Sequence, residues 1–160
     1  MDLAWSADDE AFREDLRTFL DEHENARRVL EQTITERLTK AMNYWVCTAG
    51  KDGRPHARPV WGLWVNGAVC FGGHGVRWDR NLAENPEVTV HLESGDEVVI
   101  LEGMANRITD LKDPIVARAA KASQEKYGMG GEGPFWLLRP RTVFAWTTSK
   151  RFQDATRWRF

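Results

Sequence analysis

Residues 44–71 read YWVCTAGKDGRPHARPVWGLWVNGAVCF, and this stretch carries the main signal for the fold. β-Branched and aromatic residues gather in three short runs, which is the composition of strands. These runs occupy residues 44–50, 56–64 and 68–71. Asp52-Gly53 separates the first two runs and Asn66-Gly67 the last two, and both dipeptides favour tight hairpin turns. The stretch therefore predicts three consecutive antiparallel strands.

The rest of the chain adds strands and two short helices. Strand patterns occur at residues 87–93, 97–108, 135–148 and 155–160, and helical patterns at 76–84 and 114–127. Asn85-Pro86 ends the first helix, while Asp113-Pro114 begins the second and Gly128 ends it. Pro59 lacks an amide donor, so its strand should have an edge or a bulge there. Six to seven strands joined by short turns predict a small antiparallel β-barrel with attached helices.

The N-terminal quarter has helical periodicity instead. Ser6 and Asp9 resemble a capping box, and apolar residues then recur at helical spacing over residues 7–22. A second helical pattern runs from Ala26 to Met42. We therefore predict one domain over residues 1–160, made of a helical arm at 1–42 and a barrel at 43–160.

Composition excludes several classes of protein. The 160 residues are 42% hydrophobic and 29% charged, as in one globular domain. A net charge of −2 predicts no nucleic-acid partner, and no apolar stretch approaches the ~20 residues that span a membrane. Cys47 and Cys70 lie in apolar runs without metal-binding spacing, so we expect free thiols, no metal site and a cytoplasmic location.

A glycine-rich loop leads into the first short helix. Residues 71–82 read FGGHGVRWDRNL, and Gly72 and Gly73 let the backbone approach a ligand closely. Arg77 and Arg80 are three apart, so both can lie on one helix face and bind a phosphate at the helix start. The residues by themselves leave two interpretations open, a phosphate site or a solvated helix start.

The order of these motifs resembles the pyridoxamine 5′-phosphate oxidase-like, FMN-binding split-barrel superfamily. The resemblance covers roughly residues 40–160 and is nearest to the flavin/deazaflavin oxidoreductase branch of actinobacterial type. It rests on DGRPHARPVW (52–61), the glycine loop, RNLAENP (80–86), VHLESGDEVVILEG (90–103) and the closing DATRWRF (154–160). It implies a mostly β fold with helices, a split β-barrel, that forms a homodimer with a cofactor in the cleft between the subunits.

The resemblance also implies which residues meet the cofactor, usually FMN or the deazaflavin coenzyme F-420. Four residues of one strand would lie along the flavin, two glycines near its ring or ribityl tail, and two arginines at its phosphate. These are Arg58, Pro59, Val60 and Trp61, then Gly72 and Gly73, then Arg77 and Arg80. Many relatives have Ser-Arg-Lys where this chain has Val76-Arg77-Trp78. Trp78 would stack on a ring or fill the space of a bulkier ligand.

The function implied is cofactor-dependent redox chemistry. The leading hypothesis is an F-420-dependent reductase that transfers hydride to a conjugated small molecule. His74, in the glycine loop, is the candidate proton donor because imidazole titrates near neutral pH; the alternative is an ordinary exposed histidine. Two other functions stay open: an FMN-binding oxidoreductase or oxidase, and a non-catalytic protein that binds haem, another tetrapyrrole or a lipid in the barrel cleft, with His74 as a haem ligand.

Overall fold

The computed structural model describes most of the chain from residue 31 onward. It covers residues 31–73, 76–130, 133–148 and 156–159, with Glu24 and Arg28, and gives Val76, Thr156 and Trp158 by backbone alone. The chain divides into two compact units, Met1–Glu36 and Arg37–Phe160. The predicted helix 7–22 and its capping box lie outside the described residues, whereas residues 31–40 are helical. The boundary between an arm and a barrel at residue 42 stays a prediction.

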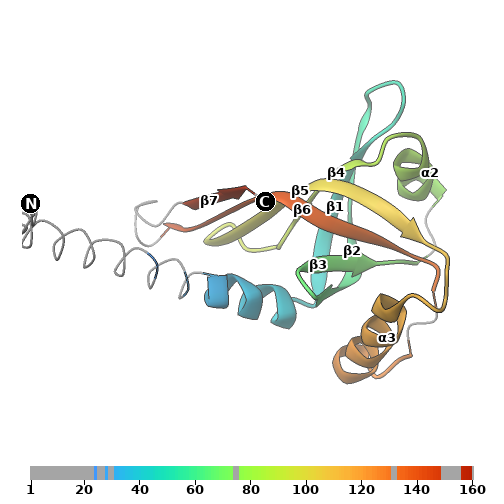
Figure 1. The fold of residues 1–160 in the computed structure, drawn as a ribbon. Helices are drawn as coiled ribbons and strands as arrows, with labels where there is room; N and C mark the ends of the chain where they lie inside the picture. The colour runs from blue at the N-terminus through green and yellow to red at the C-terminus, as the bar shows by residue number, and fades with distance from the viewer. Residues whose placement is uncertain are drawn as a thin grey trace, which may run out of the picture. The chain divides into compact units, whose positions relative to one another are not determined.

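The second unit is an antiparallel barrel with two helices (Figure 1). In chain order its elements are β1 (Asn43–Ala49), β2 (Pro55–Val65), β3 (Ala68–Phe71), α2 (Val76–Glu84), β4 (Glu87–His91), β5 (Glu97–Ile108), α3 (Pro114–Tyr127), β6 (Phe135–Thr147) and β7 (Thr156–Arg159). The strand order is β3-β2-β1-β4-β5-β6-β7, and β3 also pairs with β6. Six strands thus close into a ring, and β7 extends it along the far half of β6. The predicted fold class is confirmed.

Both predicted hairpin turns are present. Asn66 and Gly67 have φ angles of 52° and 72°, the two positive values that a two-residue turn of this type requires. Gly53 has a φ of 77° in a loop that is closed by the amide of Gly50, which donates to the carbonyl of Arg54 at 3.0 Å. The turn residues therefore set the register of β1, β2 and β3.

Pro59 lies on an edge, as predicted. The whole of β1 pairs with Pro55–Trp61 of β2 and places Trp45 opposite Pro59. On its other side β2 pairs with β3 only from Gly62 to Val65. Within the described part of the chain, the first half of β2 therefore has no strand on that side, so the missing amide of Pro59 costs no ladder hydrogen bond.

The helix ends also follow the local signals. Asp113 caps α3 by accepting a hydrogen bond from the amide of Ile115 at 2.9 Å, and Pro114 takes the first helical position. Gly128 ends α3 in the left-handed conformation with a φ of 70°. The amide of Asn85 donates to the carbonyl of Asn81 at 2.7 Å and closes the last turn of α2.

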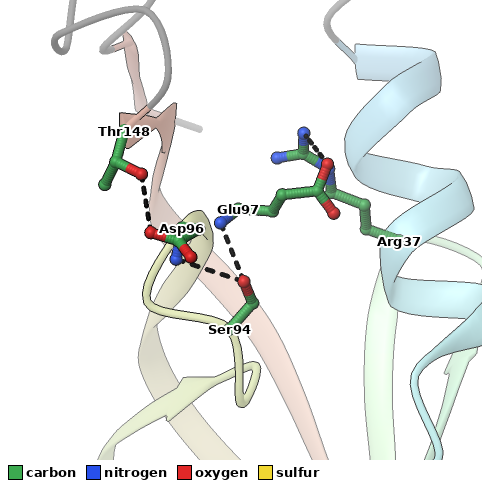
Figure 2. Close-up of polar contacts among 5 residues, drawn as sticks. All are labelled: Arg37, Ser94, Asp96, Glu97 and Thr148. Atoms are coloured by element: carbon green, nitrogen blue, oxygen red, sulfur yellow. Dashed lines mark hydrogen bonds and ion pairs between the residues drawn. The ribbon is translucent and has the colours of Figure 1, made fainter.

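The turn between β4 and β5 ties two other segments to the barrel (Figure 2). The Ser94 hydroxyl accepts from the amides of Asp96 and Glu97, at 3.2 and 2.8 Å. The Asp96 carboxylate accepts from the Thr148 hydroxyl at 2.7 Å, just beyond β6. Glu97 pairs with Arg37, near the end of helical residues 31–40, at 3.2 Å. One short turn therefore holds the helix end and the end of β6 together.

Apolar side chains fill the barrel and the space beneath α3. The largest fully buried side chains from the strands include Tyr44, Val46, Val90, Leu101 and Leu138. A second cluster packs under α3 and is formed by Val65, Ala68, Cys70, Ile115, Ala119, Phe135 and Leu137. Cys47 and Cys70 are free, as expected, and burial raises the pKa of the Cys70 thiol to about 12.

Of the described glycines, Gly103 has the least room for a side chain. The register between β5 and β6 shifts between Glu102 and Gly103. A Cβ at Gly103 would lie 2.6 Å from the carbonyl oxygen of Arg139 and 2.9 Å from Leu138 Cδ1. Because backbone stands in the way, Gly103→Ala should lower the free energy of unfolding by about 1–3 kcal/mol in urea denaturation. Gly95→Ala is the control, since nothing lies within 4 Å of its Cβ; equal stability of the two variants would contradict the prediction.

Candidate functional site

The free half of β2 and the loop after β3 enclose a pocket of about 440 Å³, which we call the β2 pocket. Seven of the residues predicted to contact a cofactor line it, together with Asn43. They are Arg58, Pro59, Val60, Trp61, Gly72, Gly73 and Trp78. Gly73 has a φ of 121°, a backbone conformation that residues other than glycine rarely adopt. The fold therefore brings together residues from three separate parts of the sequence.

Trp78 is the unusual member of this set. Its side chain is only 1% exposed and packs at a tilt against Phe71, with ring centroids 5.8 Å apart. Among the described residues, its indole Nε1 is the one buried side-chain nitrogen or oxygen without a hydrogen-bond partner. Such an orphaned donor costs about 1–3 kcal/mol. The β2 pocket thus includes a residue whose N–H lacks an acceptor in the protein.

Two polar contacts hold α2 against the barrel. On one side the Asn81 amide donates to the Thr48 hydroxyl of β1 at 3.0 Å, and both side chains are buried. On the other side Asp79 accepts from the indole N–H of Trp136 in β6 at 2.8 Å. Arg107 of β5 faces the same carboxylate at 3.9 Å. Because these contacts fix the helix rotation, Trp78 lies inside while Arg77 stays exposed.

Arg77 and Arg80 lie together, as predicted, but in a different pocket. This α2 pocket has a volume of about 380 Å³ and is lined by Gly50, Lys51, Asp52, Arg54, Arg77, Arg80, Asn81 and Glu84. Arg54 pairs with Asp52 at 3.1 Å. Lys51, Arg77 and Arg80 make no ion pair with any described residue. Four cations thus face two carboxylates, and the excess positive charge suits a phosphate or carboxylate group.

A third, smaller pocket lies beside α3 and adjoins the first. This α3 pocket has a volume of about 260 Å³. It shares Trp61, Gly72 and Gly73 with the β2 pocket. Its other lining residues come from β2, β3, α3, the loop before β6 and the first residue of β6. They are Leu63, Cys70, Phe71, Ala119, Ser123, Tyr127, Met129, Gly130, Gly133, Pro134 and Phe135.

The aromatic wall shared by these two pockets is Trp61, which belongs to a stacked pair. Trp61 is 54% exposed and stacks on Tyr127 with ring centroids 4.9 Å apart and planes 5° from parallel. The Tyr127 hydroxyl accepts from the amide of Gly62 at 3.1 Å and can donate to the carbonyl of Gly62 at 2.7 Å or of Met42 at 2.9 Å. The end of α3 thereby holds the Trp61 ring in place.

Lys126 lies next to this pair and is half-buried. Its ammonium donates to the carbonyl of Gly62 at 3.0 Å and lies 5.1 Å from the ring centroid of Tyr44 and 5.3 Å from that of Tyr127. These contacts favour the charged form, but burial outweighs them and lowers the pKa of Lys126 to about 8. Burial also raises the pKa of the Tyr127 hydroxyl.

The histidines of the chain add nothing described to these pockets. His74 lies outside the described residues, so its catalytic role stays a prediction. The histidines of the described strands line none of the three pockets: His56 lies in β2, and His91 stacks on Trp45. The described ranges contain no group of three or more His, Cys, Asp or Glu that could hold a metal ion. No helix in those ranges is both long and apolar enough to span a bilayer.

Some pocket residues escaped the sequence analysis. Lys51 and Arg54 had a usable signal, because they flank the predicted Asp52-Gly53 turn close to Arg58 in sequence. For Asn43 and Asn81 the sequence offers no signal other than their position in or next to a predicted element. Tyr127 lies 66 residues beyond Trp61 (127 − 61), and only barrel closure brings the two rings together.

The lowered pKa of Lys126 predicts a specific pH dependence of stability. The unfolded lysine titrates near 10.5 and the folded one near 8, so between these values the unfolded state binds more protons. The free energy of unfolding should therefore rise with pH from about 8 to 10.5, and this contribution should be flat below pH 8. Urea denaturation across this range should show a smaller rise in Lys126→Met. Lys121→Met, an exposed lysine on the same helix, is the control; an unchanged rise in Lys126→Met would refute the assignment.

Comparisons with known proteins place the chain. The family model for pyridoxamine 5′-phosphate oxidase matches residues 30–147, while the comparison with curated proteins gave no match. Among solved structures, a conserved hypothetical protein of Mycobacterium tuberculosis has a TM-score of 0.64 and 20% identity, over 76% of this chain and 86% of that one. A heme-binding protein of Mycobacterium smegmatis has a TM-score of 0.61 and 19% identity, over 79% of this chain and 56% of that one. An F-420 reductase has a TM-score of 0.51 and 19% identity, over 68% of this chain and 93% of that one. These likenesses show a shared fold, and the family match shows that the chain belongs to the pyridoxamine 5′-phosphate oxidase family of split β-barrels.

Proposed function

We propose that this protein is a reductase dependent on the deazaflavin coenzyme F-420, which transfers hydride to a conjugated small molecule. The observation that carries the proposal is the pair of pockets beside α2. One is walled by Trp61 and Trp78 and the other by four cations. A cofactor with a planar ring and an anionic tail has the matching chemistry. The F-420 reductase among the structural neighbours adds support through its fold.

The β2 pocket suits the ring of such a cofactor. Trp61 offers exposed aromatic surface, Trp78 forms the buried side of the lining, and Gly72 and Gly73 add no side-chain bulk. The Nε1 of Trp78 is buried and unpartnered; if cofactor binding brings a carbonyl or ring nitrogen to it, the contact would remove the cost of the buried donor. The Arg58 side chain, also in the lining, would interact with the polar edge of the ring.

The α2 pocket suits the anionic tail. Arg54 and Arg58 are four residues apart, which corresponds to about 13 Å along an extended strand, so one ligand can reach from one pocket to the other. Arg54 is paired with Asp52, so Lys51, Arg77 and Arg80 are the cations of this pocket without an ion pair to a described residue. These three cations would bind a phosphate, and the more negatively charged tail of F-420 would engage all of them.

A reduced deazaflavin supplies the hydride when bound, and a proton from an acid completes the reduction of a substrate double bond. The protein's own contribution is to hold the ring against the loop at Gly72 and Gly73 and to exclude water. We also propose His74 as the proton donor, because it follows Gly73 in the same sequence segment and imidazole is the side-chain group that ordinarily exchanges protons near neutral pH. This assignment rests on the sequence.

A homodimer and a cytoplasmic location complete the proposal. Trp61 and Met42 are each about half exposed; Trp61 lines two pockets, and Met42 contacts Tyr127 through its carbonyl. A second subunit would cover these apolar side chains. The two free cysteines, Cys47 and Cys70, support a reducing compartment.

Two other functions have support of their own. FMN would use the same two pockets with a single phosphate, which makes an FMN-dependent oxidoreductase or oxidase the first alternative. The heme-binding protein of Mycobacterium smegmatis has the same fold, and Trp78 stands where many relatives have a lysine; both favour a non-catalytic binder of haem or another apolar ligand. Titration with F-420, FMN and haemin, followed by quenching of tryptophan fluorescence, separates the three.

Cofactor affinity should depend on the α2 pocket. Arg77→Ala and Arg80→Ala should each weaken F-420 binding about 10- to 100-fold, since each removes a charge-assisted contact, and the wild-type affinity should fall as salt rises. Arg118→Ala removes an exposed arginine of α3 that lines none of the three pockets and should bind normally. Normal binding by both pocket variants would refute the anion site.

Trp78 should matter to the ligand more than to the fold. Trp78→Phe removes the unpartnered N–H, and the gain offsets part of the lost packing. We therefore expect the free energy of unfolding without cofactor to stay within about 1–2 kcal/mol of the wild type. F-420 affinity should fall about 10-fold because the donor is lost. Unchanged affinity, measured by the same fluorescence titration, would show that Nε1 meets no ligand.

A further inference from the structure

We propose that the α3 pocket binds an uncharged, planar aromatic molecule, and that this molecule is the substrate. Its role as a substrate rests on the proposed function above, whereas its binding does not. The proposal follows from three properties of the pocket: the absence of charge among its described lining residues, its aromatic walls, and its position beside the β2 pocket.

The described lining residues of the α3 pocket disfavour a charged ligand. None of its described lining residues is ionised at neutral pH: the Cys70 thiol has its pKa raised to about 12 by burial. The Tyr127 hydroxyl is already engaged by Gly62 and Met42, so the groups left to hydrogen-bond a ligand are the Ser123 hydroxyl, the Trp61 indole N–H and the weakly polar Cys70 thiol, all uncharged. A charged molecule would lose its hydration here without a partner, which is costly. The α2 pocket has the opposite character, with six charged residues.

The walls favour a flat ring. Trp61, Phe71, Tyr127 and Phe135 all line the pocket, and the hydrogen bonds of Tyr127 hold the Trp61 ring in a fixed plane. Aromatic ligands gain from stacked and edge-to-face contacts with such rings. The volume of about 260 Å³ lies just below the ~300–1,000 Å³ of pockets for drug-sized ligands. The occupant is therefore small.

The position of the pocket links it to the cofactor site. Trp61, Gly72 and Gly73 belong to both pockets. Gly72 packs closely on Phe135, since a Cβ added at Gly72 would lie 3.5 Å from Phe135 Cβ, and Gly73 has no side chain to separate two ligands. A molecule in the α3 pocket would therefore lie against the same stretch of backbone as a ring in the β2 pocket.

Two fluorescent probes that differ by one charge test the inference. N-phenyl-1-naphthylamine is neutral, and 1-anilinonaphthalene-8-sulfonate has the same ring skeleton with a sulfonate. The full-length protein should bind the neutral probe saturably, with one site per chain, and the sulfonate at least 10-fold more weakly. Ser123→Phe, which fills the pocket, should weaken binding of the neutral probe at least 10-fold. Gln124→Phe, the neighbouring exposed residue outside the lining, should bind it as the wild type does.

A second variant guards against misfolding of the first. Met129 lines the pocket but is half exposed, so Met129→Glu places a charge at the pocket without disturbing the core. This variant should also weaken binding of the neutral probe. Equal affinity for the two probes, or neutral-probe binding in Ser123→Phe and Met129→Glu that equals the binding in Gln124→Phe, would overturn the site.

Titration of the same proteins with F-420 separates this inference from the proposed function. Ser123→Phe should keep the wild-type affinity for F-420, because Ser123 lines only the α3 pocket. If the wild type binds no F-420 but its neutral-probe binding is sensitive to Ser123→Phe, the binding site stands, and the proposed function fails together with the substrate role. If F-420 binds and the neutral probe does not, the α3 pocket inference fails and the proposed function stands.

Discussion

The pairing of β3 with the start of β6 closes the barrel, and all three pockets depend on it. Only four residues of β3 are available, and Phe71, the last of them, lies opposite Trp136. Phe71 packs against Trp78, and Trp136 donates to Asp79. The same strand contact that closes the ring therefore orients α2 from two directions and delivers the loop at Gly72 and Gly73 to the pockets.

Charged side chains gather at the α2 pocket and are absent from the described lining of the α3 pocket. The exposed side of α2 and the β1–β2 turn collect four cations, two of them close in sequence to a hairpin glycine and two on a single helix face. The α3 side of the same loop collects aromatic and small residues. Electrostatic attraction on one side and desolvation on the other would sort a long cofactor and a small neutral partner into different pockets without any moving part.

Two groups near Trp61, the wall that the β2 and α3 pockets share, are held in energetically unfavourable surroundings. Tyr127 uses its hydroxyl to hold β2 and the segment before β1, and Lys126 is held half-buried beside it with a pKa lowered to about 8. The orphaned Nε1 of Trp78 is a second such cost. Both lie around Trp61, where an ordered surface is of most use to a ligand, and unfavourable local terms commonly gather at functional sites.

Much of the fold could be predicted from the sequence because its signals are local. Turn glycines, alternating strands, Asp113-Pro114 and Gly128 set the element boundaries through backbone conformation and capping within a few residues. Most of the candidate site was predictable too, but through the order of motifs rather than through physical reasoning on single residues. His74 is the exception, since it lies outside the described residues and its role stays a prediction.

The division of the site residues between the pockets depends on the tertiary structure. Arg77 and Trp78 are adjacent in sequence, yet the rotation of α2, set by Asn81 on Thr48 and Trp136 on Asp79, places them in separate pockets. Likewise the stack of Trp61 on Tyr127 joins β2 to the end of a helix more than sixty residues later. The elements and their turns could be read from local sequence, because they depend on neighbours along the chain. Pocket membership depends on contacts between distant segments, which exist only after the barrel closes.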